Sequence, residues 1–63
     1  MQVTIAKAIL AAVTTEKEQQ MAGIPVFYAK DEEEQVRIAT ILSRVMEAVA
    51  HDLENGILII VKH

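Results

Sequence analysis

The sequence predicts a small α+β domain of the α/β-like kind, an α-β-α-β module with two short strands that fills residues 1–63 as a single domain. Three observations predict it. Helix-capping residues enclose a periodic apolar segment over residues 31–56. Two runs rich in β-branched residues, 24–29 and 57–61, have the composition of strands. Apolar residues at helical spacing precede them over residues 3–21.

The first segment, residues 3–21, is predicted to be helical and to end before Gly23. Its alanine content favours a helix, and its larger side chains fall along a helical stripe. Two other arrangements stay open. Thr15 followed by Glu18 is a possible capping box that would divide the segment into two helical pieces. Alternating polarity over residues 2–5 also permits a strand at the start. The stripe consists of Val3, Ile5, Ile9, Ala12, Val13 and Met21.

The first predicted strand covers residues 24–29, between Gly23 and a charged helix start. Pro25 has no backbone N–H to donate to a neighbouring strand, so this strand is expected at an edge of the sheet. Alternation along a strand places Val26 and Tyr28 on one face and Phe27 on the other.

The central helix is predicted to run from Asp31 to Gly56. Asp31 is a good N-cap because its carboxylate can accept from the free N–H groups of the first turn. Glu34, three residues later, completes a capping box. The acidic residues 32–34 lie where the helix dipole favours negative charge. Asn55 and Gly56 are residue types that suit a left-handed C-cap.

Two adjacent rows of apolar residues follow this helix, wider together than the single stripe needed to cover a small sheet. The helix is therefore expected to pack against two surfaces. The first row is Ala39, Leu42, Met46, Val49 and Leu53, and the second row is Ile38, Ile41, Val45 and Ala48.

The second strand, residues 57–61, consists of five apolar residues without alternation, which indicates burial on both faces. Strand, helix and strand in this order favour a parallel pair with a right-handed crossover. If Pro25 marks one outer edge, the other edge of residues 57–61 is free and apolar. Pairing with a symmetry mate would extend the sheet across a two-fold axis. We expect a homo-oligomer, a dimer first, with Ile57, Ile59, Val61, Leu42, Met46 and Val49 at the interface.

Composition supports self-association and narrows the class of protein. A domain of 63 residues buries only about 60% of the surface that its unfolded chain exposes, yet 52% of its residues are hydrophobic. A net charge of −3 and scattered basic residues argue against nucleic-acid binding. No apolar run reaches the roughly 20 residues that a membrane span needs. Together with the absence of cysteine, these features predict a cytoplasmic protein that binds no membrane.

Few residues suggest chemistry. Glu47, His51 and Glu54 would share one face of the predicted helix and could bind a divalent metal, although a solvated face is the commoner outcome. Tyr28, near the helix start, could border a ligand, but a structural role is commoner. Ser43 lies inside the helix without the glycines of a nucleophile elbow. The sequence predicts neither catalytic residues nor a cofactor.

These features predict a small non-enzymatic interaction or regulatory protein that forms a homo-oligomer and has room for a protein partner. The alternative is a small-ligand or metal-binding protein with its site at the subunit interface, using Glu47, His51 or Tyr28. One experiment distinguishes these two hypotheses, because only a metal site predicts that a chelator lowers the melting temperature of the protein.

Overall fold

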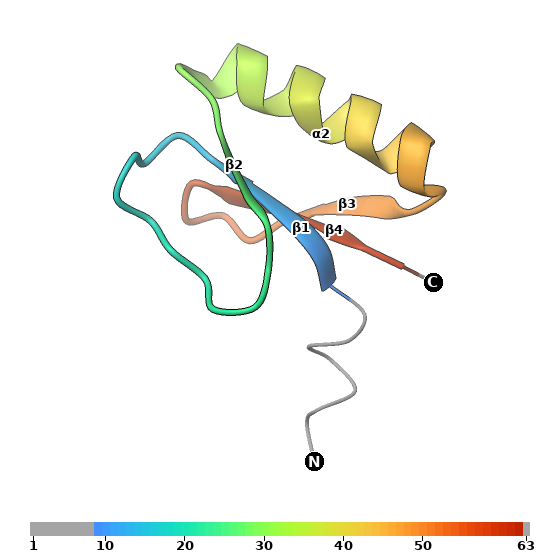
Figure 1. Ribbon diagram of the computed structural model, residues 1–63. Coiled ribbons are helices and arrows are strands. Elements are labelled where there is room, and N and C mark those ends of the chain that lie inside the picture. The colour runs from blue at the N-terminus through green and yellow to red at the C-terminus, as the bar shows by residue number, and fades with distance from the viewer. Residues whose placement is uncertain (1–8, 63) are drawn as a thin grey trace.

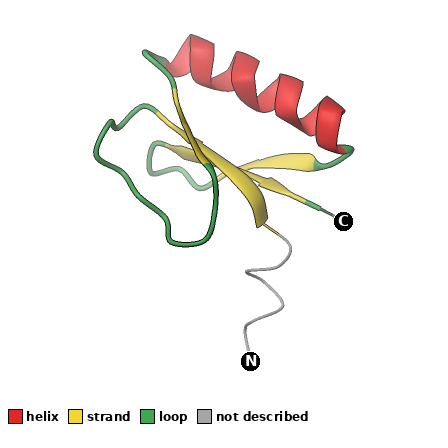
Figure 2. Ribbon diagram, in the orientation of Figure 1, coloured by secondary structure: helices red, strands yellow, loops and turns green. Residues whose placement is uncertain are grey.

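A computed structural model describes residues 9–62 and shows a four-stranded mixed sheet with a helix along one face (Figures 1 and 2). The predicted α+β class is confirmed. The elements in chain order are β1 (Ile9–Thr14), β2 (Val26–Tyr28), α2 (Glu32–Met46), β3 (Val49–Asp52) and β4 (Ile57–Val61).

The strand order across the sheet is β2-β1-β4-β3. β1 pairs in parallel with β2 and antiparallel with β4, and β4 pairs antiparallel with β3. It follows that β1, β2 and β3 run in one direction and β4 in the other. In this arrangement β1 and β4 are the two central strands, while β2 and β3 are the edges.

Residues 9–14 form a central strand, so the prediction of a helix there is wrong. Ala11, Ala12, Val13 and Thr14 are all fully buried between the neighbouring strands and the layers around them. A strand buried on both faces shows no alternation of polarity, and a short apolar run of this kind cannot be distinguished from a helix by periodicity. The predictions for residues 3–8 lie outside the described residues.

The predicted helix start is confirmed, but its end is wrong. Asp31 Oδ1 accepts from the Glu34 N–H at 2.8 Å, as the N-cap prediction requires. The Glu34 carboxylate accepts a hydrogen bond from the N–H of Lys30, the residue before the cap. The helix then stops at Met46, because Glu47 takes a left-handed conformation (φ 54°) and its N–H bonds back to Arg44 and Ser43 carbonyls.

Residues 48–56, which follow that cap, form a strand and a turn instead of helix. β3 begins at Val49, and Asn55-Gly56 lie in the turn between β3 and β4, where Gly56 has φ 90°. Asn and Gly suit a β-turn as well as a helix cap, because both tolerate positive φ. The prediction therefore located a real chain reversal and assigned it to the wrong element.

The predicted strands are present, but their pairing differs from the prediction. β2 is an edge strand, as Pro25 indicated, and β4 is a strand over Ile57–Val61. They are not neighbours, because β1 lies between them. The strand–helix–strand crossover instead joins β2 to β3. Both edges of β4 are paired within the chain, so the free edge predicted for the dimer does not exist.

The core lies between α2 and the two central strands. Its buried members are Ala11, Val13, Ala29, Ala39 and Ile60, and half-buried residues that include Leu42, Met46 and Leu58 pack against them. Small alanines on β1 and α2 let the helix approach the sheet closely. Because this face of α2 packs against the sheet, the other sides of the helix remain exposed.

Candidate functional site

The second row of α2 includes two exposed large apolar residues, and Val36, which belongs to neither row, is a third on the helix. The first row packs inward through Ala39, Leu42 and Met46. In the second row Ile38 is half-buried against the core, whereas Ile41 is 53% exposed and Val45 is 73% exposed. Residues four apart are neighbours on a helix surface, so Ile41 and Val45 form one continuous apolar ridge. The sheet of this chain leaves that ridge uncovered.

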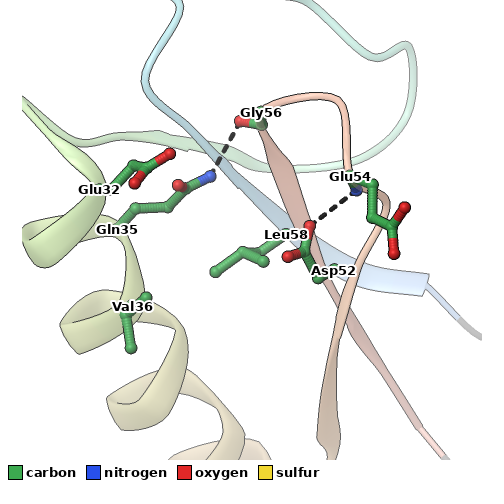
Figure 3. A pocket seen from close by; sticks show the side chains of 7 residues that line it. All are labelled: Glu32, Gln35, Val36, Asp52, Glu54, Gly56 and Leu58. Carbon is green, nitrogen blue, oxygen red and sulfur yellow. Dashed lines mark hydrogen bonds between the residues drawn. The ribbon is translucent and has the colours of Figure 1, made fainter.

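A hollow of 310 Å³ lies on the other side of α2, between the helix start and the β3–β4 turn (Figure 3). Residues of α2, β3, the β3–β4 turn and β4 contribute to it. Its lining residues are Glu32, Gln35, Val36, Asp52, Glu54, Gly56 and Leu58. Three of them are carboxylates and none is basic, so the hollow is strongly acidic at neutral pH.

Gln35 lines this hollow and joins the helix to β1 and to the β3–β4 turn. Its Nε2 donates to the Val13 carbonyl at 2.8 Å and to the Gly56 carbonyl at 2.9 Å. Only 5% of the residue is exposed. Both amide hydrogens are used, so the position of the amide group is fixed.

Two of the carboxylates lie at the end of β3 and in the turn that follows it. Asp52 Oδ1 accepts from the Glu54 N–H at 2.7 Å, and the Leu53 N–H donates to the Ile57 carbonyl at 3.1 Å. Glu54 has φ 64°, a left-handed conformation that residues other than glycine and asparagine adopt at a cost. These bonds hold the turn in place despite that cost.

The three predicted metal ligands are not on one helix face. Glu47 is the C-cap of α2, His51 lies in β3 and Glu54 lies in the following turn. The spacing argument fails because the helix ends before any of the three. Within residues 9–62, no three His, Cys, Asp or Glu side chains gather closely enough to hold a metal ion.

The predicted interface residues are divided between the inside and the outside of the chain. Ile57 is buried in β4, where Ile59 and Val61 are half-buried. Leu42 and Met46 pack against the core. Val49, at the start of β3, is exposed. Tyr28 is exposed as well, and its hydroxyl donates to the Gln19 carbonyl at 2.8 Å, which ties β2 to the preceding loop.

Sequence reasoning missed Gln35 and the hollow that it lines. One signal was available, since residues 35, 39, 42 and 46 follow the spacing of the first row, which makes Gln35 a polar residue in line with a buried stripe. The hollow itself depends on β3 and its turn, which the prediction had placed in the helix.

Comparisons with known proteins give a consistent result over almost the whole chain. A family model described as "Capping complex subunit for YIEGIA" matches residues 6–63. A protein of Bacillus subtilis (strain 168), described as uncharacterized protein YpzH, is 32% identical over 60 residues, which cover 95% of this chain and 94% of that protein. No solved structure matches. In the part of the chain that the structure describes, no helix has the length and apolar character needed to cross a membrane.

Proposed function

The chain belongs to the family of capping complex subunits for YIEGIA, and from this we propose that it is a non-enzymatic protein that binds a protein partner within such a complex. The observation that carries the proposal is the exposed ridge of Ile41 and Val45 on α2. A small domain rarely leaves adjacent large aliphatic side chains on a helix without a surface to cover them. The partner named in the family description is the occupant that we assign to it.

The energetics of the ridge suit a protein interface. Burying one valine or isoleucine side chain contributes about 1.5–3 kcal/mol. Ile41 and Val45 are already held in place by a packed helix, so little ordering of the backbone is required on binding. The ridge therefore resembles the apolar anchors around which protein interfaces form.

The side chains available for chemistry support a binding role. Ser43 donates its hydroxyl to the Ala39 carbonyl at 2.8 Å, so it is held within the helix as a back-bonded residue. The lining of the hollow, as far as the structure describes the chain, includes three carboxylates. Its carboxylates are suited to attracting a positive charge.

Replacing one ridge residue tests the proposal. Val45→Lys should weaken co-purification with the YIEGIA partner about ten-fold or more, because it removes a buried aliphatic contact and places a charge in the interface. Thr40→Lys is the matched control, since it adds the same charge to another exposed β-branched residue of α2. Lysine has a good helix propensity, so both variants should keep the fold.

The proposal fails if Val45→Lys and Thr40→Lys bind the partner equally well. It also fails if the wild-type chain does not bind the partner at all. Circular dichroism of the three proteins gives the control for folding, because a loss of binding counts only where the helical signal is unchanged.

A second candidate is self-association through β3. All four β3 residues are exposed, and β4 is the only strand that pairs with β3 among the described residues. β2 follows Pro25, which has no backbone N–H to pair with another strand, whereas β3 contains no proline. Antiparallel pairing of two such edges would give the homodimer predicted from the sequence, through a different strand. A mass of one chain, 7.0 kDa, across a concentration series would contradict this candidate.

A further inference from the structure

We propose that the protein partner adds an extended segment to the outer edge of β2, beside the apolar ridge of α2. This inference rests on the proposed function, because it specifies how the partner contacts this chain. It assigns a second surface, the outer edge of β2 with the side chain of Phe27, to the same interface.

The outer edge of β2 presents unpaired backbone groups. The Pro25 carbonyl accepts from a β1 N–H at 2.9 Å, and the Ala29 N–H donates to a β1 carbonyl at 2.8 Å. Backbone groups alternate in direction along a strand, so Phe27 also faces β1, whereas Val26 and Tyr28 face away from it. Because β2 is the last strand on that side of the described sheet, the N–H and C=O groups of these two residues lack a strand partner. Such an edge can pair with another extended chain.

Within residues 9–62, neither the proline nor the preceding loop closes this edge. Pro25 removes no donor from it, because the backbone of Pro25 faces β1. The loop between β1 and β2 extends away from α2 (Figure 1), and the Tyr28 hydroxyl reaches its Gln19 carbonyl. Successive side chains of a strand point to opposite faces, so Phe27 lies on the face away from the loop. Phe27 pairs with Val13 of the core, which places it on the α2 side of the sheet.

The ridge lies on the β2 side of α2. Val36 lines the hollow, which β3 and β4 border on the other side. Val45 follows nine residues later, about two and a half helical turns, so it lies on the opposite side of the helix. In the strand order β2-β1-β4-β3, the side opposite β3 and β4 is the side of β2. α2 packs on β4, β1 and β3, and Phe27 of β2 is left 38% exposed.

An extended segment of the partner suits both the free edge and the apolar surface. Its backbone would pair with Val26 and Tyr28, and every second side chain would point to the α2 side of the sheet. Apolar side chains at those positions would cover Phe27 and extend toward the ridge. The segment that fits is therefore an extended chain with large apolar residues at alternate positions.

A second copy of this chain suits the same edge less well. α2 packs mainly on β4, which is separated from β2 by β1. Joining two β2 edges would place the two β4 strands five strand spacings apart, which is about 24 Å. Packed helices lie about 8–10 Å apart. The two helices could not cover each other's ridges, so we assign the edge to the partner.

Amide hydrogen exchange in the complex tests the pairing. The ¹⁵N-labelled chain is exchanged in D₂O alone and with the YIEGIA partner, quenched, and measured residue by residue by NMR. The Val26 and Tyr28 amides should exchange about ten-fold more slowly or less in the complex, because each gains a hydrogen bond. Ala50 is the control. The Leu53 N–H donates to β4, so alternation turns the Ala50 N–H to the outer edge of β3, and its exchange should not change.

Three results would overturn the inference. In the first, Val26 and Tyr28 exchange as fast in the complex as in the free chain. In the second, Ala50 becomes slower in their place, which would assign the pairing to β3. In the third, Val26 and Tyr28 become slower in the chain alone as its concentration rises, which would identify a second copy as the occupant.

Two alanine substitutions provide a matched pair for the side-chain contact. Phe27 and Leu53 are large apolar residues, 38% and 45% exposed. Phe27→Ala should weaken binding of the partner about ten-fold or more, as truncation of an interface aromatic residue does. Leu53→Ala, after β3 on the other side of the sheet, should leave binding unchanged. Equal affinities of the two variants, with unchanged circular dichroism, would overturn the inference.

Binding of the YIEGIA partner separates this inference from the proposed function. If Val45→Lys loses the partner, while the Val26 and Tyr28 amides of the wild-type complex stay fast, strand addition is overturned and the proposed function stands. If the wild-type chain does not bind the partner, the proposed function fails, and this inference fails with it.

Discussion

Gln35 is a polar side chain in line with the buried apolar row of α2, and its two hydrogen bonds reach both β1 and the turn before β4. The Val13 carbonyl that it serves belongs to a fully buried residue. A buried carbonyl without a donor is costly. Gln35 thus holds the helix start to the sheet and also orients one wall of the acidic hollow.

Gln35→Leu should lower the free energy of unfolding by about 2–4 kcal/mol, because it removes two hydrogen bonds and takes the side-chain donor away from the buried Val13 carbonyl. Urea denaturation followed by circular dichroism measures this value. Thr40→Val is the control: it removes an exposed hydroxyl that bonds to the Val36 carbonyl within the helix, and it should change stability by less than about 0.5 kcal/mol. Equal effects of the two substitutions would show that Gln35 has no special structural role.

At the scale of elements, the predictable parts were those with a local chemical signal. The N-cap at Asp31, the edge position of the strand after Pro25 and the apolar strand 57–61 were all predicted from local residues. The end of α2 was not, because Glu47 adopts the left-handed cap without being glycine or asparagine. A glutamate in that position does not indicate the end of a helix.

β1 was mispredicted for a different reason. Its alanines have high helix propensity, and tertiary packing between two strands overrides that preference. The acidic hollow could not be predicted from the sequence once β3 was assigned to the helix, since two of its carboxylates depend on the β3–β4 turn. The second apolar row was predicted to face another surface, and Ile41 and Val45 of that row are exposed in the part of the chain that the structure describes.

The sheet order predicts unequal protection of its strands. Amide hydrogen exchange should be slowest in β1 and β4, which are paired on both sides, and faster in the edge strands β2 and β3. NMR of the chain in D₂O measures the rates. If the amides of β3 exchange as slowly as those of β4 in a monomeric sample, the result contradicts this order. If exchange in β3 becomes slower as the protein concentration rises, the result supports self-association through β3.

At the scale of the whole molecule, α2 covers one face of a small sheet and contributes to two further surfaces, an apolar ridge and an acidic hollow. A chain of 63 residues buries only about 60% of its unfolded surface. Binding to a partner would therefore add to its stability as well as to its function, since a ligand of the folded state shifts the folding equilibrium.

The most direct test of the central claim is the mass by light scattering of the purified chain, alone and mixed with the YIEGIA partner. The account predicts a single species with the summed mass of the two proteins, and the same mixture with Val45→Lys should separate into its components. A wild-type chain that elutes apart from the partner, at the mass that it has alone, would contradict the claim.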